Sequence, residues 1–212
     1  GWVDSETFPS QEVEPVNLYL TDDGLSLTPP SDVGVAGYRY DPEDPAPTIG
    51  GATLRGGAFP AGPRDQSPLA ERGDVLSFAT SPLSSAVRVA GWVQATLWVE
   101  SDAPLTDFVV RLIDIHEDGT MLGVTDGILR SHFEQGKPSR IEIDLWATDY
   151  AFAAGHRIGI QVTSSSFPRW QRAMNVDEPL GQVTQGRVAN QQVYFGGDFP
   201  SSLRIGGGAD WR

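Results

Sequence analysis

Apolar and polar residues alternate with a period of two through the middle of the chain. The clearest example is the stretch 87–100, VRVAGWVQATLWVE. Successive side chains of a β-strand point to opposite faces of the sheet, so this alternation predicts a strand with one buried face. We expect the buried face to hold Val87, Val89, Val93, Ala95, Leu97 and Val99, and the opposite face to hold Arg88, Gln94, Thr96 and Glu100.

Six further segments follow the same rule, and turn-forming sequences such as EDGT, QGKPS and AAGH separate them. No segment longer than about ten residues keeps the apolar spacing of an amphipathic helix. The pattern therefore predicts an all-β fold, a jelly-roll β-sandwich of two antiparallel sheets that forms a single domain over 1–212. The six segments are 74–80, 107–115, 121–133, 140–146, 157–165 and 202–206.

Two stretches interrupt this series of strands. Residues 41–73 are rich in proline and glycine, and residues 171–191 carry little strand signal. Long irregular segments are uncommon inside a compact domain, and they are usually functional or lie at an interface. The 41–73 loop is therefore the first place to look for a site.

Charge and composition narrow the classes of partner. The 212 residues include 15 basic and 28 acidic side chains, a net charge of −13, and the acidic residues are spread along the chain. Such a field repels phosphate backbones and anionic bilayers, so we expect no nucleic-acid or membrane partner. The chain has no cysteine, which excludes disulfides and thiolate catalysis. The first residues lack the pattern of a signal peptide, which favours a cytoplasmic location, although secretion stays open.

The sequence offers little support for catalysis by this chain itself. A nucleophile elbow of the form G-x-S-x-G is absent. Three serines, Ser164–Ser166, lie close after His156, but they fall at the end of a predicted strand, and His156 falls in a turn. We expect the imidazole of His156 to bond a nearby carbonyl or carboxylate and to serve structure rather than catalysis.

The sequence predicts no metal or cofactor site. His116 and His132 are expected at the surface near strand ends, and the three histidines form no H-x-H or H-x-x-x-H pair. The acidic turns 21–25 and 116–120 could offer oxygen ligands to calcium, although neither has the spacing of an EF-hand loop. Calcium binding is therefore left open, and plain hairpin turns are the favoured interpretation.

Two tryptophans belong to the less apolar face of the 87–99 strand. Trp92 and Trp98 could stack on a carbohydrate or seal an interface with a neighbouring loop or domain. Burial at an interface is the favoured interpretation, because tryptophan is enriched at protein interfaces.

Several ordered motifs resemble the C-terminal domain of the CocE/NonD hydrolases. They are YDPEDPAPTIGG with GPRDQSPLAERGDVLSFATSPL, then VRVAGWVQATLWVESDAPLTDF with VVRLIDIHEDGTMLGVTDGILRSHF, and last AFAAGHRIGIQVTSSSFPRWQRAMN. This family includes cocaine esterase, α-amino-acid ester hydrolases, glutaryl acylases and, more distantly, prolyl dipeptidyl peptidases. The resemblance extends from about Trp2 to Ile205 and implies a galactose-binding-like jelly roll carried behind an α/β-hydrolase catalytic domain. The catalytic serine, aspartate and histidine of such a domain have no counterpart in this chain.

The resemblance also implies where a substrate would pass. The stretch GGATLRGGAFPAGPRDQ matches a loop that approaches the substrate pocket in the family, and the pocket-proximal pair falls near Leu54 and Arg55. Arg55 departs from the aromatic residue of cocaine esterase, and Leu105 departs from an acidic residue in many relatives, whereas Asp107 is kept. The residues expected near substrate are Leu54, Arg55, Phe59, Asp65 and Gln66.

Three functions follow as hypotheses. The first is a non-catalytic domain that stabilises an α/β serine hydrolase and shapes its substrate entrance, with that catalytic domain or subunit as partner. The second is a carbohydrate-binding module with Trp92 or Trp98 as platform. The third is an assembly surface that forms a homo-oligomer.

Overall fold

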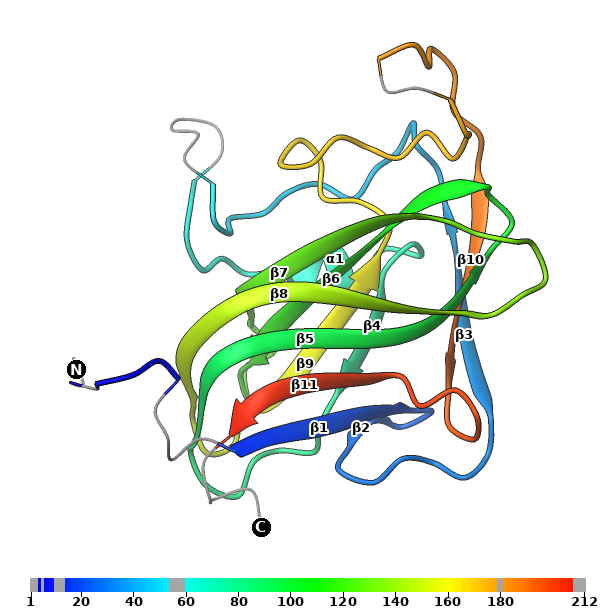
Figure 1. The fold of residues 1–212 in the computed structure, drawn as a ribbon. Coiled ribbons are helices and arrows are strands. Elements are labelled where there is room, and N and C mark those ends of the chain that lie inside the picture. Colours follow the sequence, from blue (N-terminus) through cyan, green and yellow to red (C-terminus); the bar gives the residue numbers. More distant parts are fainter. Residues whose placement is uncertain (1–3, 5, 10–13, 54–59, 179–180, 208–212) are drawn as a thin grey trace.

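The computed structural model describes residues 4, 6–9, 14–53, 60–178 and 181–207 and confirms the all-β sandwich with antiparallel sheets (Figure 1). The described residues form eleven strands and one short helix. The strands are β1 (Glu14–Thr21), β2 (Gly24–Ser26), β3 (Gly34–Tyr40), β4 (Leu76–Ala79), β5 (Val87–Ser101), β6 (Leu105–Ile115), β7 (Met121–His132), β8 (Ser139–Phe152), β9 (Arg157–Thr163), β10 (Ala189–Phe195) and β11 (Ser202–Gly207), and the helix is α1 (Ser67–Ala70).

The strands form two sheets. The larger sheet has the order β2-β1-β11-β5-β10-β3, with β8 paired to β5 along Val87–Val99, and the smaller sheet has the order β4-β9-β6-β7. All strand pairs within both sheets are antiparallel. The long strands β5 and β8 curve together around one end of the molecule (Figure 1). The 41–73 loop and the segment after β9 lie on the same side of the sandwich, beyond the edge of β7 and β8 (Figure 1).

Strand β5 buries the face that its alternation predicts. The side chains of Val89, Val93 and Leu97 are wholly buried, and they belong to one apolar cluster with Phe108 and Leu112 of β6. Burial of apolar area is the main favourable contribution to folding, so the alternation in the sequence carries most of the information for this layer.

Strand β8 runs further than the predicted 140–146 and contains a β-bulge. Trp92 of β5 lies opposite Ala147 and Gln94 lies opposite Asp144, so two residues of β8 occupy the space of one. The second of them, Trp146, has a φ of 67°, and its backbone N–H donates to Oδ1 of Asp144 at 2.8 Å. A left-handed conformation is uncommon for a bulky residue, which makes this position a candidate for a function.

Strand β6 presents different side chains to its two faces. Val110 and Leu112 belong to the core between the sheets. Arg111 points to the other face, where it lines a cavity together with Ile49 and Gln66 of the 41–73 loop. The loop therefore covers the outer face of the smaller sheet. None of the helical structure among the described residues is long and apolar enough to cross a bilayer.

Candidate functional site

A cavity of about 560 Å³ lies between the 41–73 loop, strands β7 and β8, and the segment that follows β9. The loop that lines it is the one that the sequence singled out. Residues whose contacts define the cavity are Gly51, Gln66, Arg111, Asp126, Trp146 and Arg169.

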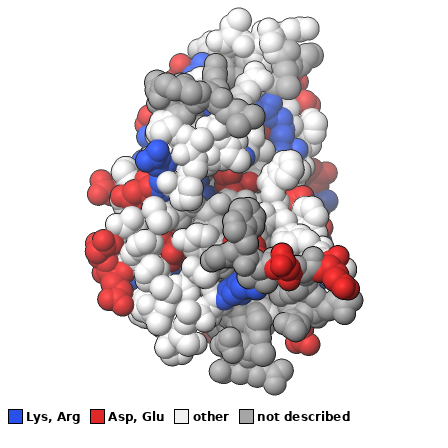
Figure 2. Space-filling view, turned by 90° about the vertical axis from the view of Figure 1, so that its left-hand side faces the viewer, with Lys and Arg blue, Asp and Glu red and all other residues white. Residues whose placement is uncertain are grey.

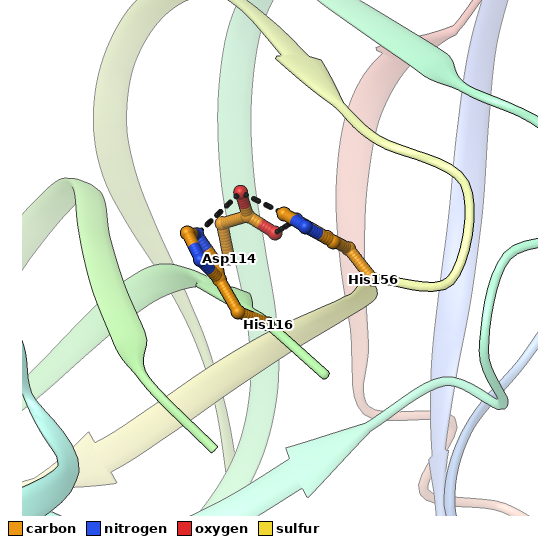
Figure 3. A group of neighbouring side chains, drawn as sticks. All are labelled: Asp114, His116 and His156. Atoms are coloured by element: carbon orange, nitrogen blue, oxygen red, sulfur yellow. Dashed lines mark hydrogen bonds and ion pairs between the residues drawn. The ribbon is translucent and has the colours of Figure 1, made fainter. Parts of the chain in front are cut away.

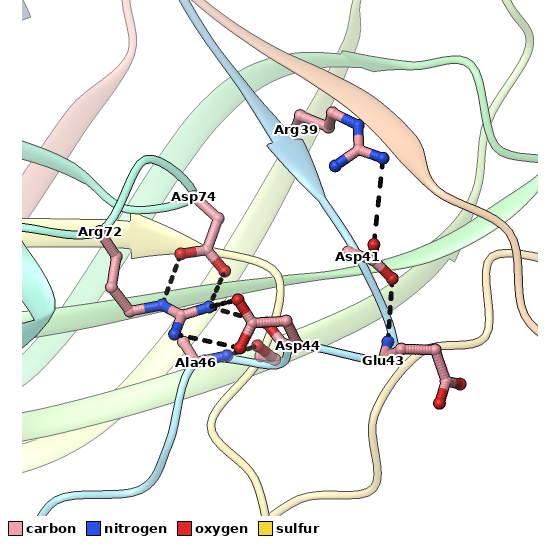
Figure 4. Close-up of polar contacts among 8 residues, drawn as sticks. Arg39, Asp41, Glu43, Asp44, Ala46, Arg72 and Asp74 are labelled. Atoms are coloured by element: carbon pink, nitrogen blue, oxygen red, sulfur yellow. Dashed lines mark hydrogen bonds and ion pairs between the residues drawn. The ribbon is translucent and has the colours of Figure 1, made fainter.

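Ion pairs hold together the two ends of the 41–73 loop (Figure 4). The Arg72 guanidinium donates from Nε to Asp74 Oδ1 at 2.7 Å and from Nη2 to the backbone carbonyl of Asp44 at 2.7 Å. The Asp74 carboxylate raises the pKa of Arg72 above its usual range. The arginine thus joins the start of the loop to its end.

Two of the three serines after β9 anchor the loop to the sandwich, and the third bonds strand β3. Ser165 Oγ accepts a hydrogen bond from the backbone N–H of Ala46 at 2.8 Å, and the hydroxyl of Thr48 donates to the carbonyl of Ser166 at 2.8 Å. Ser164 Oγ lies 2.9 Å from the hydroxyl of Tyr38. All three serines are buried, and none of the described hydrogen bonds joins a serine to a histidine. Their role is structural.

A buried cluster of alternating charge forms the floor of the cavity. Arg111 is buried, and burial lowers the pKa of its guanidinium, an effect that the nearby Asp126 opposes and Arg169 reinforces. Arg169 pairs with Asp126, and Arg111 donates from Nη1 to Oε1 of Gln161 at 3.1 Å. Asp126 therefore serves as the counter-charge to two arginines.

Glycines let the loop approach this cluster closely. Gly51 has a φ of 81°, and a β-carbon there would lie 3.0 Å from a guanidinium nitrogen of Arg169. Gly50 has a φ of 65°, and a β-carbon there would lie 2.5 Å from the carbonyl oxygen of Gly62. Residues with a side chain would be strained at both positions, so glycine is required for the loop to cover the charges.

Gln66 joins the loop to the rest of the cavity wall. Its Nε2 donates to the carbonyls of Ile49 at 2.8 Å and Arg64 at 2.9 Å, and its Oε1 is buried without a hydrogen-bond partner among the described residues. The neighbouring Asp65 carboxylate accepts hydrogen bonds from the backbone N–H groups of Met121 and Ser67, which lowers the pKa of Asp65.

The five residues predicted to lie near substrate are not all found at the cavity. Gln66 lines the cavity, whereas Asp65 fixes the loop to the start of β7. Leu54, Arg55 and Phe59 lie outside the described residues. Their closeness to substrate stays a prediction.

Two tryptophan side chains are exposed, and one of them lies at the cavity. Trp146 on its rim is 65% exposed. Trp92 is 61% exposed, whereas Trp98 is half-buried and packs edge-on against Phe199 at 5.4 Å. The sequence-based prediction did not include Trp146, although the alternation over 141–146 places it on the same exposed face as Glu142 and Asp144. Its positive φ and the bulge leave no signal in the letters IDLWATD.

Asp107, near the start of β6, has a structural partner. Asp107 is buried and forms a two-point ion pair with Arg130, at 2.6 Å and 2.8 Å. Burial raises the pKa of Asp107, and Arg130 opposes that rise. Leu105 lies at the edge of a separate hollow that Arg130 also lines.

With this geometry established, comparison with known proteins identifies the family. The family described as the X-Pro dipeptidyl-peptidase C-terminal non-catalytic domain matches residues 1–204. The chain belongs to this family. The cavity and the 41–73 loop therefore lie within an X-Pro dipeptidyl-peptidase C-terminal domain.

Relatives of this domain are parts of longer hydrolases. Cocaine esterase of Rhodococcus sp. (strain MB1 Bresler) is 33% identical over 95% of the chain, which spans 39% of that protein. Among solved structures, an aminopeptidase of a marine-sediment Thaumarchaeota archaeon superposes with a TM-score of 0.88 at 27% identity, over 99% of this chain and 39% of that one. An α-amino acid ester hydrolase superposes with a TM-score of 0.81 at 26% identity, over 90% of this chain and 36% of that one.

Proposed function

We propose that this chain is the C-terminal domain of an α/β serine hydrolase that acts on esters, amides or X-Pro dipeptides, and that it stabilises this enzyme and shapes its substrate entrance. The observation that carries the proposal is the match of residues 1–204 to a non-catalytic domain family, in a chain that spans 39% of its cocaine esterase relative. The lack of a G-x-S-x-G turn agrees with a catalytic serine supplied from elsewhere.

The cavity face supports docking of the catalytic domain at the 41–73 loop. Trp146 exposes most of its ring at the rim, although its backbone adopts a conformation that bulky residues rarely take. Exposed tryptophans commonly anchor interfaces. In Figure 2, acidic side chains gather along both lateral margins of the visible face, and basic and uncharged side chains lie between them.

Labelling with a fluorophosphonate, which reacts with activated serines, tests this function. The purified 212-residue chain should resist labelling and should not hydrolyse p-nitrophenyl acetate with saturation kinetics. Protein isolated from its source should show a labelled catalytic unit, either in the same polypeptide or co-purifying with it. Saturable esterase activity and labelling of the 212-residue chain alone would overturn the proposal.

Carbohydrate binding is a second candidate, because one exposed tryptophan borders a separate hollow. This hollow of about 490 Å³ is lined by Trp92, Gln94, Asp144 and Arg204, a combination of an aromatic ring with hydrogen-bonding side chains. Glycan-array binding that is lost in Trp92→Ala and kept in Trp146→Ala would favour this role. Flat titrations against a broad glycan panel would remove it.

A further inference from the structure

Two histidines and an aspartate converge at the end of the smaller sheet where β6 ends and β9 begins (Figure 3). Asp114 lies near the end of β6, His116 follows it by two residues, and His156 precedes β9. Asp114 pairs with Ile158 across the two strands, so this register brings His156 to the same sheet end as His116. One ligand atom from each of the three side chains lies within 4.8 Å of the others.

The histidine nitrogens point at one carboxylate. His156 Nδ1 lies 2.9 Å from Asp114 Oδ1 and 3.1 Å from Oδ2, and His116 Nε2 lies 3.4 Å from Oδ2. The two imidazole rings stack with centroids 4.2 Å apart and an interplanar angle of 29°. The stack therefore aligns two nitrogens beside the same acidic group.

Among the described residues, the cluster contains no lysine or arginine, and one of its ring nitrogens has no hydrogen-bond partner. Asp114 is 2% exposed, and no lysine or arginine nitrogen among the described residues lies within 4 Å of its carboxylate. His116 Nε2 is buried and has no hydrogen-bond partner among those residues. Burying a carboxylate without a cation is costly, and a buried nitrogen without a partner adds to that cost. A metal cation would remove both costs at once.

The distances suit a tetrahedral ion. Zinc binds imidazole nitrogen and carboxylate oxygen at about 2.0–2.2 Å, which places two ligand atoms of a tetrahedral site roughly 3.3–3.5 Å apart. The separation of His116 Nε2 and Asp114 Oδ2 already has this value, and that of His156 and Asp114 is a few tenths of an ångström shorter. The two imidazole nitrogens lie within 4.8 Å of each other, so an ion would also have to draw the stacked rings together at their nitrogen ends.

A supporting hydrogen bond orients the carboxylate. The hydroxyl of Tyr150 donates to Asp114 Oδ2 at 2.8 Å, and burial together with this carboxylate raises the pKa of Tyr150. Metal-binding carboxylates are commonly held in this way by an outer hydrogen-bond donor. Tyr150 therefore fixes the carboxylate in a position where both histidines can share an ion with it.

We propose that Asp114, His116 and His156 bind a divalent transition-metal ion of the zinc type. Two imidazoles and one carboxylate match the ligand preference of zinc and its transition-metal neighbours, whereas calcium and magnesium prefer oxygen alone. Three protein ligands leave a fourth position for water. The ion ties β6, the turn that follows it and the turn before β9, and it acts as a staple at this end of the sandwich.

The direct test is metal titration of the 212-residue chain, prepared without a histidine tag and stripped of metal. Isothermal titration with Zn²⁺ should show one site, and Co²⁺ should develop the intense visible bands of a tetrahedral complex. At a free Zn²⁺ concentration of about 100 times Kd, the melting temperature should rise by roughly 5–10 °C. An excess of Ca²⁺ should not compete.

The third histidine of the chain supplies a matched control. His132 is exposed and lies 3.0 Å from Asp177 in a separate pair. His116→Ala and His156→Ala should each weaken Zn²⁺ binding by at least about 10-fold, as expected for the loss of a ligand, and His132→Ala should leave it unchanged. Circular dichroism checks that each variant is folded, and His116→Gln repeats the test with a side chain of similar size.

Two results would overturn the proposal. The first is the absence of saturable binding of Zn²⁺ or Co²⁺ to the folded chain at millimolar concentrations. The second is binding that persists in both His116→Ala and His116→Gln. Either result would mean that Asp114 only accepts hydrogen bonds from His156 and Tyr150 in a metal-free cluster.

Discussion

Two of the charged side chains that strand β6 buries, Arg111 and Asp114, point to opposite faces and have different surroundings. Arg111 faces the cavity, where Asp126 is the counter-charge and the 41–73 loop closes over the cluster. Asp114 shares the core-facing side of β6 with Leu112, and Tyr150 and two imidazoles surround it. Both charges are almost inaccessible to water.

The two clusters differ in how many other segments of the chain must be in place to hold them. The Arg111 cluster is covered by the 41–73 loop, which is held in place by Arg72, Gln66 and the buried serines. Contacts between residues far apart in the sequence must therefore form before water is excluded from this cluster. The Asp114 cluster depends on the register of β6 with β9 and on one residue of β8. The cavity cluster thus depends on a loop at the proposed partner surface, and the Asp114 cluster is built into the sandwich.

The largest effect is expected where one carboxylate balances two arginines. Asp126→Ala leaves Arg111 and Arg169 close together without a counter-charge, which should lower the free energy of unfolding by about 3–5 kcal/mol. Arg169→Ala removes one cation and leaves Asp126 beside Arg111, so its cost should be about 1–2 kcal/mol. Urea unfolding followed by tryptophan fluorescence measures both values. A larger loss for Arg169→Ala than for Asp126→Ala would refute this charge balance.

A second test asks what the Asp114 carboxylate contributes in the absence of metal. Asp114→Asn keeps the shape but weakens the hydrogen bonds from Tyr150 and His156, and we expect a loss of about 2 kcal/mol in buffer with a chelator. Asp118→Asn is the control, because Asp118 lies on an exposed turn of the same hairpin. A more stable Asp114→Asn variant would show that the buried charge costs more than its hydrogen bonds return.

A third test measures how much Gln66 contributes to holding the 41–73 loop in place on the sheet. Gln66→Ala removes the donors to the carbonyls of Ile49 and Arg64, which should cost about 1–2 kcal/mol and speed proteolytic cleavage within 41–73. Ser67→Ala is the matched control, because Ser67 is the next residue and its hydroxyl bonds only the side chain of Asp65. Unchanged cleavage in Gln66→Ala would mean that the serines and Arg72 alone hold the loop.

The sequence predicts the core layers better than either cluster, for reasons that particular residues show. The alternation of β5 gives its buried face directly, because burial there is purely apolar. Strand β10 has no such signal, since Gln191 is buried in it and bonds Thr106 and Ser164. The prediction also placed His116 at the surface, yet its ring is half-buried. The Asp-x-His pair on one strand face was the available clue, but its third member lies 40 residues away and is found only through strand register.

The smallest effect is expected at Trp146, where stability and docking should separate. This bulge requires a left-handed backbone conformation, which costs a residue with a β-carbon about 1 kcal/mol of folding free energy. Glycine adopts this conformation without that cost. The indole is mostly exposed, so its removal loses little burial. We therefore expect Trp146→Gly to leave the chain as stable as before or up to about 1 kcal/mol more stable in urea unfolding, while weakening its association with the proposed catalytic domain. Trp92→Ala, an exposed tryptophan without a positive φ, should bring no such gain. A clear loss of stability in Trp146→Gly would mean that the ring stabilises the cavity rim itself, and a partner would no longer be needed to explain why a bulky side chain occupies this position.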